Sequence, residues 1–166
     1  SVALEQWRDI WLNEGFASYA EWLWSEEQGE GTAQEIFDYI YATSPDDFWT
    51  IPPGDPGAAN IFDGAVYDRG AATLHQLRLT VGDDDFFEIV RTWAADHRHG
   101  NANTAEFIAL AEKISGQQLD ELFEVWLFTP SKPALPAARS AAAPPSQPKS
   151  WASIEAAHAL LKNKNW

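Results

Sequence analysis

Signals that end helices divide this sequence into segments, and this division constrains the fold more than any other feature. Glycines or prolines stand at the segment ends, at Gly29, Pro45, Gly82, Gly116 and Pro130. Within the segments, apolar residues recur at three- and four-residue spacing, which is typical of amphipathic helices. No stretch shows the alternation with a period of two that predicts a strand. We therefore predict an all-α fold, an irregular domain of about six helices.

The sequence predicts helices at about residues 13–28, 32–43, 65–81, 83–97, 103–115 and 119–128. Thr32 and Glu35 form a capping box at the start of the second helix. Residues 44–63 contain four prolines and predict a long irregular loop.

The end of the chain has a different composition from the helical part. Residues 1–133 form the predicted helical domain, and residues 134–150 are rich in alanine, proline and serine, which predicts a semi-rigid linker. Residues 151–166 then contain a short terminal helix with an apolar side that includes Ile154 and Leu161. Three arrangements of this helix remain open, because it can pack back on the domain, contact another copy of the chain, or be ordered only by crystal neighbours.

The net charge of −14 excludes some classes of partner. Such an acidic chain is not expected to bind nucleic acid or an anionic membrane surface. No run of 18 apolar residues predicts a membrane span, and no signal-peptide pattern is present, so we expect a soluble protein. The absence of cysteine excludes disulfides and thiolate metal sites. The compartment, cytoplasmic or secreted, is not determined by these features.

Glu14 is the candidate metal ligand, in a tryptophan-rich stretch near the start of the chain. Asn13 is a suitable N-cap and would place Glu14 in the first turn of a helix that ends at Gly29. A carboxylate on a rigid helix packed by aromatic residues has the fixed position that a metal ligand needs. The simpler alternative is that Glu14 only complements the helix dipole.

The segment Leu12–Ala17 reads Leu-Asn-Glu-Gly-Phe-Ala. With the tryptophans before it, this segment resembles the signature of the aminopeptidase-N family of zinc metallopeptidases, the gluzincins that include the leukotriene hydrolases. In that family, zinc is bound by the two histidines of H-E-x-x-H and by a glutamate that follows the second histidine after 18 residues. The resemblance assigns Glu14 as this third ligand. Only 13 residues precede Glu14, so we expect the H-E-x-x-H motif upstream of Ser1.

Tyr67 is the candidate catalytic residue. The segment Tyr67–Ala71 is similar to the family pattern Tyr-x-[Lys/Arg]-Gly-Ala, in which the tyrosine hydroxyl donates to the oxyanion of the tetrahedral intermediate. A phenol with a pKa of about 10 is protonated at neutral pH and is therefore able to donate. For a lone tyrosine the alternative is a structural role at the domain edge. A weaker similarity at Trp126–Pro130 extends the resemblance to about residue 133.

The resemblance implies a zinc-dependent aminopeptidase that hydrolyses N-terminal residues from peptides. Its cofactor would be zinc, its substrate a peptide, and its partner the upstream part of the same catalytic domain. Two zinc ligands and the general base would lie before Ser1, so we predict that the 166 residues alone neither bind zinc in this manner nor hydrolyse peptides. The alternative is a non-catalytic helical interaction module related to this family.

None of the four histidines has a spacing that would replace the missing ligands. His97 and His99 lie in a predicted helix C-terminus, where cationic side chains suit the helix dipole. His75 is expected to be a hydrogen-bonded structural histidine. His158 belongs to the terminal segment.

Overall fold

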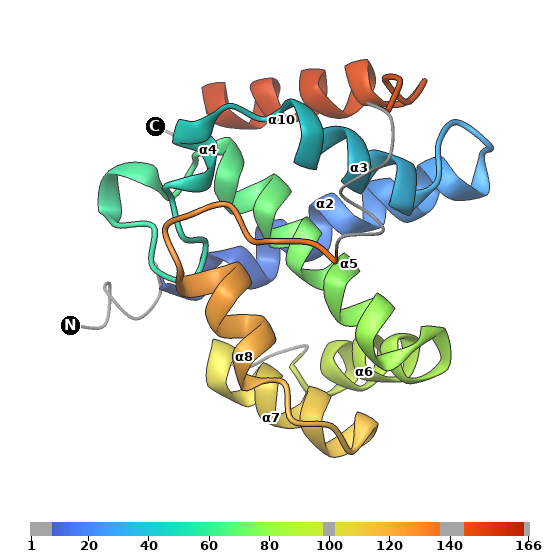
Figure 1. Ribbon diagram of the computed structural model, residues 1–166, viewed down its shortest axis with the longest axis vertical. Coiled ribbons are helices and arrows are strands. Elements are labelled where there is room, and N and C mark those ends of the chain that lie inside the picture. Colours follow the sequence, from blue (N-terminus) through green and yellow to red (C-terminus); the bar gives the residue numbers. More distant parts are fainter. Residues whose placement is uncertain (1–7, 98–101, 137–144, 165–166) are drawn as a thin grey trace.

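The computed structural model describes residues 8–97, 102–136 and 145–164, and it confirms the all-α prediction. Within these ranges the chain forms helices and turns and no strand. Two long helices, α2 (Ile10–Glu27) and α5 (Gly70–Val81), cross at the centre (Figure 1). At one end of this pair lie α6 (Asp83–Asp96), α7 (Thr104–Ser115) and α8 (Asp120–Phe123), and at the other end α3 (Ala33–Thr43), α4 (Asp46–Trp49) and α10 (Trp151–Lys164).

The structure corrects the predicted start of the first helix. α2 begins at Ile10, so Asn13 is not its N-cap and Glu14 lies in the second turn. Trp11 and Leu12 are buried in the core, and this tertiary burial stabilises the additional turn that local capping signals do not predict. Asp9, at the actual N-cap position, does not cap the helix, because its Oδ1 accepts from the backbone N–H of Thr104 at 2.9 Å and from its hydroxyl at 2.8 Å.

Other predicted signals are confirmed. The Thr32–Glu35 capping box forms, and Gly29, Gly82 and Gly116 close their helices with positive φ angles. The loop prediction for residues 44–63 is partly wrong, because this stretch contains the short helix α4 and a 3₁₀ turn at Ala58–Asn60. The helices predicted at 65–81 and 119–128 exist, but each contains a π-helical segment, η2 (Ala65–Arg69) before α5 and η3 (Glu124–Phe128) after α8.

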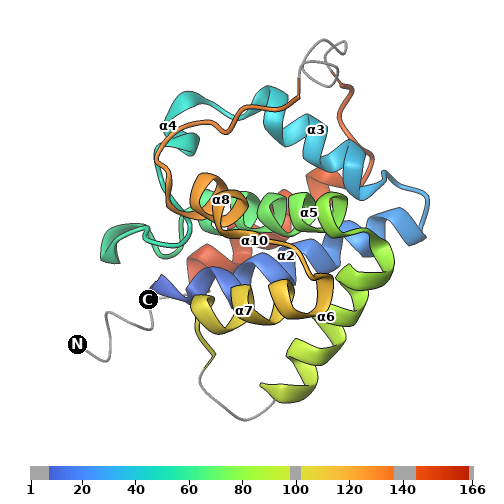
Figure 2. The same ribbon diagram turned by 60° about the horizontal axis from the view of Figure 1, so that its bottom comes forward.

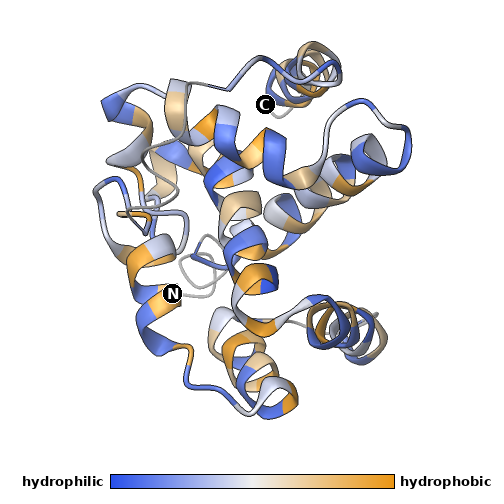
Figure 3. Ribbon diagram, turned by 45° about the vertical axis from the view of Figure 1, so that its right-hand side comes forward, coloured by the Kyte–Doolittle hydropathy of each residue, from blue (hydrophilic) through white to orange (hydrophobic). Residues whose placement is uncertain are grey.

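Aromatic side chains fill the core between the helices. Phe107 packs edge-on against Trp11, Phe16 and Trp93, with ring centroids 5.2–6.0 Å apart. Figure 2 shows α7 beside α2, and Figure 3 shows polar and apolar residues alternating along the helices. Among the described residues, no helix is both long and apolar enough to cross a bilayer.

Two glycines set the distance between the central helices. A Cβ atom at Gly15 would lie 3.1 Å from the carbonyl carbon of Gly70, and one at Gly70 would lie 3.2 Å from the Cα of Gly15. The two backbones are therefore in direct contact where α2 meets the start of α5. Glu14 on α2 directly precedes Gly15, and Tyr67 on η2 lies three residues before Gly70. The contact between the two glycines therefore places Glu14 and Tyr67 near one another.

The side chain of Arg69 holds η2 in place. Arg69 is fully buried, and its guanidinium donates to the backbone carbonyls of Trp49, Val125, Trp126 and Thr129. Burial lowers the pKa of Arg69 to about 10, so the group remains charged at neutral pH. One side chain thus ties η2 to the ends of α4 and η3.

Replacing Arg69 with methionine is expected to destabilise the fold strongly. Arg69→Met keeps much of the side-chain volume but leaves buried carbonyls without a donor, which costs about 3 kcal/mol or more of the free energy of unfolding. Urea unfolding followed by circular dichroism measures the change. Arg91→Met is the matched control, since Arg91 is exposed, and its effect should stay within about 0.5 kcal/mol. Equal stabilities of the two variants would contradict the role of Arg69.

The glycine contact predicts a second effect on stability. Gly70→Val places branched atoms against the backbone of Gly15, and the helices must separate at a cost of about 1–3 kcal/mol. Gly64→Val is the control, because a Cβ atom at Gly64 meets no atom within 4 Å. The same unfolding experiment compares them, and a Gly70→Val protein as stable as the Gly64→Val protein would refute the close approach.

Candidate functional site

The structure brings Glu14 and Tyr67 together on one side of the α2–η2 contact. Burial and the negative charge of Glu14 raise the pKa of Tyr67 to about 12. Charge effects of this kind require short separations, because solvent screens distant charges. The two residues singled out from the sequence, 53 positions apart in the numbering, therefore share one environment.

The side chain of Glu14 is partly buried. Burial raises its pKa, and the charge of His158 opposes this shift. Among the residues that the structure describes, none forms a hydrogen bond or ion pair with it. An interaction with the helix dipole is weak here, because Glu14 lies beyond the first turn of α2. A half-buried carboxylate without a donor fits a position next to a bound cation.

Tyr67 is 3% exposed and lies in the π-helical segment η2. π-Helical turns are rare and frequently occur at functional sites. Within the described part of the chain, no hydrogen bond to the Tyr67 hydroxyl is found, so the ordinary partner of a structural tyrosine is not seen there. The raised pKa keeps this phenol protonated at neutral pH, which preserves it as a donor.

Asp68, the neighbour of Tyr67, is a second carboxyl group near the same place. Its Oδ1 is shielded from solvent and has no hydrogen-bond partner among the described residues. Burial is the main cause that raises the pKa of Asp68 to about 7; the charges of Glu155 and Glu21 add to the rise, and those of His158 and Lys162 oppose it. The α2–η2 surface thus gathers carboxyl groups that are partly removed from water.

His158 of α10 is the site residue that the sequence analysis missed. Its ring lies over Tyr67 with the centroids 5.2 Å apart, and its Nε2 donates to Glu21 Oε1 at 3.1 Å. Its Nδ1 is 3.6 Å from Asp68 Oδ1, an ion-pair distance too long for a hydrogen bond. Burial alone would lower the pKa of His158, but the hydrogen bond to Glu21 and the charges of Asp68, Glu21 and Glu14 together raise it.

A sequence signal for His158 exists. The segment Ile154–His158 reads Ile-Glu-Ala-Ala-His, with a glutamate and a histidine spaced as in the E-x-x-H part of the motif expected upstream. Isoleucine stands where that motif has its first histidine, and Ile154 is buried as an apolar residue. The spacing alone did not indicate that α10 would reach the site, because that depends on how the helix docks.

The other histidines have structural roles or lie elsewhere. His75 is buried, with its Nδ1 2.8 Å from the Tyr19 hydroxyl and its Nε2 2.9 Å from Gln34 Oε1, which confirms the expected structural histidine. His97 follows α6 and pairs with Glu106, and His99 lies outside the described residues. Across residues 8–97, 102–136 and 145–164, no group of three histidine, cysteine, aspartate or glutamate side chains is arranged to hold a metal ion.

Comparison with known proteins identifies the family of the chain. The model of the peptidase family M1 domain matches residues 1–126. Aminopeptidase A of Gloydius brevicauda is 30% identical over 144 residues, and aminopeptidase N of Streptomyces lividans is 31% identical over 146 residues. These alignments cover 81% and 77% of this chain but only 15% and 16% of the relatives, so the chain spans a small part of their length.

Solved structures agree in fold. A mutant of a two-domain M1 zinc metallopeptidase, bound to L-arginine, superposes with a TM-score of 0.68 at 34% identity, over 78% of this chain and 30% of that one. The M1 zinc metallopeptidase of Deinococcus radiodurans gives a TM-score of 0.62 at 31% identity, over 84% of this chain and 30% of its own. Together with the family match over residues 1–126, these similarities show that the chain belongs to peptidase family M1.

Proposed function

We propose that this chain is the part of a zinc aminopeptidase that supplies the third metal ligand, Glu14, and the oxyanion donor, Tyr67. The observation that carries the proposal is the close approach of Gly15 and Gly70, which brings α2, the helix of Glu14, against η2, the segment of Tyr67. A metal ligand and an oxyanion donor must face the same reacting carbonyl, and two groups on unrelated surfaces would not meet this requirement.

The chemistry of Glu14 fits a zinc ligand. Its carboxylate is held on a rigid helix, is partly removed from water and has no donor among the described residues that competes for it. When bound, zinc supplies Lewis-acid activation of the scissile carbonyl and of the attacking water. Glu14 itself fixes one coordination position, and its single negative charge leaves the site cationic enough to attract a carbonyl oxygen.

Tyr67 contributes a neutral donor at a fixed place. As negative charge develops on the carbonyl oxygen, the phenol hydroxyl donates a hydrogen bond to it. A pKa of about 12 means that the proton stays on Tyr67 throughout the neutral range. Arg69 positions this donor by anchoring η2 through backbone carbonyls.

The remaining ligands and the general base are proposed to come from an H-E-x-x-H helix upstream of Ser1. Besides binding the metal, such a site recognises the cationic amino terminus of a peptide. The net negative charge of the chain suits this recognition. A non-catalytic module related to the family is the competing proposal. The sequence of about 20 residues before Ser1 discriminates between them, since a degenerate motif there supports the module.

Zinc content tests the role of Glu14. In the protein extended by the residues before Ser1, Glu14→Gln replaces a charged ligand by a neutral amide and is expected to weaken zinc binding by about tenfold or more. Metal analysis after dialysis against a chelator measures the content. Glu27→Gln, an exposed change on the same helix, should retain zinc. The isolated 166-residue chain is expected to hold no stoichiometric zinc, and zinc retained by Glu14→Gln or by the isolated chain would refute the assignment.

Peptide hydrolysis tests the role of Tyr67. In the extended protein, Tyr67→Phe removes the hydroxyl and keeps the ring, and kcat should fall by about 100- to 1000-fold with little change in KM. Tyr41→Phe removes a phenol that donates to the Pro133 carbonyl elsewhere, and its kcat should stay close to that of the unchanged protein. A chromogenic aminopeptidase substrate gives both constants. Full activity of the Tyr67→Phe protein contradicts the proposed donor.

A further inference from the structure

The terminal helix α10 lies directly over the candidate site. It packs beside α2, and His158 from its middle contacts both elements that carry the site, Glu21 on α2 and Tyr67 on η2. The hydroxyl of Ser18 lies 3.5 Å from the same Nε2 atom that contacts Glu21. Tyr67, a proposed donor to substrate, is only 3% exposed while this ring covers it.

Charge favours this arrangement. The surface under α10 carries Glu14, Glu21 and Asp68, and His158 and Lys162 of α10 are the cations that act on Asp68. Glu155 opposes them with a negative charge of its own. A cationic group on α10 therefore occupies the place where a positively charged ligand would find the same carboxylates.

The first turns of α10 anchor the helix. Trp151 and Ile154 are buried, and the Trp151 ring packs edge-on against Tyr39 at 5.7 Å. The Ser25 hydroxyl donates to Ser150 Oγ at 2.6 Å. Later in the helix, Leu160 and Leu161 are 62% and 45% exposed, so the apolar contact is limited to the beginning of α10.

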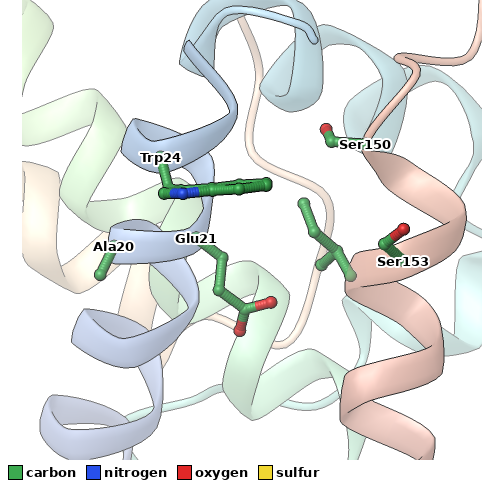
Figure 4. A pocket seen from close by; sticks show the side chains of 6 residues that line it. Ala20, Glu21, Trp24, Ser150 and Ser153 are labelled. Atoms are coloured by element: carbon green, nitrogen blue, oxygen red, sulfur yellow. The ribbon is translucent and has the colours of Figure 1, made fainter. Parts of the chain in front are cut away.

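Packing between α10 and α2 is incomplete. A pocket of about 320 Å³ lies between them, lined on α2 by Ala20, Glu21 and Trp24 and on the α10 side by Ser150, Ser153 and Ile154. Figure 4 shows the Trp24 ring and the α10 residues on opposite sides of this space. This space is open to solvent, and the contacts that are missing there lower the free energy gained by docking the helix.

We propose that α10 is an intramolecular cap that, while docked, covers the surface of Glu14, Tyr67 and Asp68 and excludes a cationic ligand from it. Release of α10 opens the surface. The inference rests on the proposed function for the identity of that ligand, a metal ion at Glu14. The coverage of Tyr67 by His158 and the incomplete packing do not depend on that identity.

A disulfide that locks the cap tests the proposal. The chain contains no cysteine, and the side-chain oxygens of Ser25 and Ser150 are 2.6 Å apart, so Ser25→Cys with Ser150→Cys places two sulfurs within bonding reach. Acetylation of tyrosine by N-acetylimidazole, mapped by peptide mass spectrometry, reports whether Tyr67 is accessible. The two single-cysteine variants are the matched controls, and Tyr41 is the internal control because its hydroxyl donates to the Pro133 carbonyl and its ring packs against Phe37 and Trp49, which lie outside α10.

The locked protein is expected to acetylate Tyr67 about tenfold more slowly than either single variant, because reaction requires local opening of the cap. Ile154→Asp places a carboxylate in the anchor and should raise the rate above that of the unchanged chain, with an unchanged helical circular dichroism spectrum. Tyr41 should react equally in all variants. Equal rates at Tyr67 in the locked and single-cysteine proteins would overturn the proposal.

A second measurement separates this inference from the proposed function. In the protein extended upstream of Ser1, the oxidised double-cysteine variant should show lower aminopeptidase activity, and reduction of the disulfide should restore it. If the extended protein is inactive in both redox states, the proposed aminopeptidase function fails, whereas the acetylation rates still decide whether α10 caps Tyr67. If activity is full with the disulfide intact, the cap does not exclude the ligand.

Discussion

The backbone contact between Gly15 and Gly70 is the constraint on which the candidate site depends. Side chains at these positions would hold α2 and α5 apart, because a Cβ atom on either glycine would come within 3.1–3.2 Å of the opposite backbone. Glu14 precedes one of these glycines, and Tyr67 stands three residues before the other. The close approach therefore sets the separation between a carboxylate and a phenol that come from distant parts of the chain, and it does so through backbone atoms, which have less freedom to adjust than side chains.

A second constraint holds the phenol in position. η2 is π-helical, and its backbone alone does not account for its orientation. The guanidinium of Arg69 holds the segment by donating to backbone carbonyls at the end of α4 and in η3. The same buried surroundings that require these hydrogen bonds raise the pKa of Tyr67 and Asp68. The stability of the fold and the electrostatics of the site thus have a common origin in the burial of η2.

The chain belongs to peptidase family M1. It spans only 15–16% of the length of the aminopeptidases with which it was compared. The acidic surface of Glu14, Glu21 and Asp68 is suited to a cation, and in this chain His158 of α10 lies on it. A cap and a cationic ligand that neutralise the same carboxylates compete by necessity. In the proposed function, the affinity of the site for its ligand then depends on the free energy of docking α10 as well as on Glu14 and Tyr67.

The sequence by itself determined the all-α class, the capping box at Thr32 and the helix ends at Gly29, Gly82 and Gly116, because these depend on local backbone preferences. Short motifs in the sequence also singled out the two candidate residues, Glu14 and Tyr67. The prediction for the start of α2 was wrong by three residues, because the burial of Trp11 and Leu12 outweighed the local preference of Asn13 for an N-cap position. Only the tertiary structure decided that Arg69 would anchor η2 and that His158 would cover Tyr67. The contacts of Arg69 with η3 and of His158 with Tyr67 join residues more than 50 positions apart, and no local pattern encodes which surfaces of the folded helices will meet.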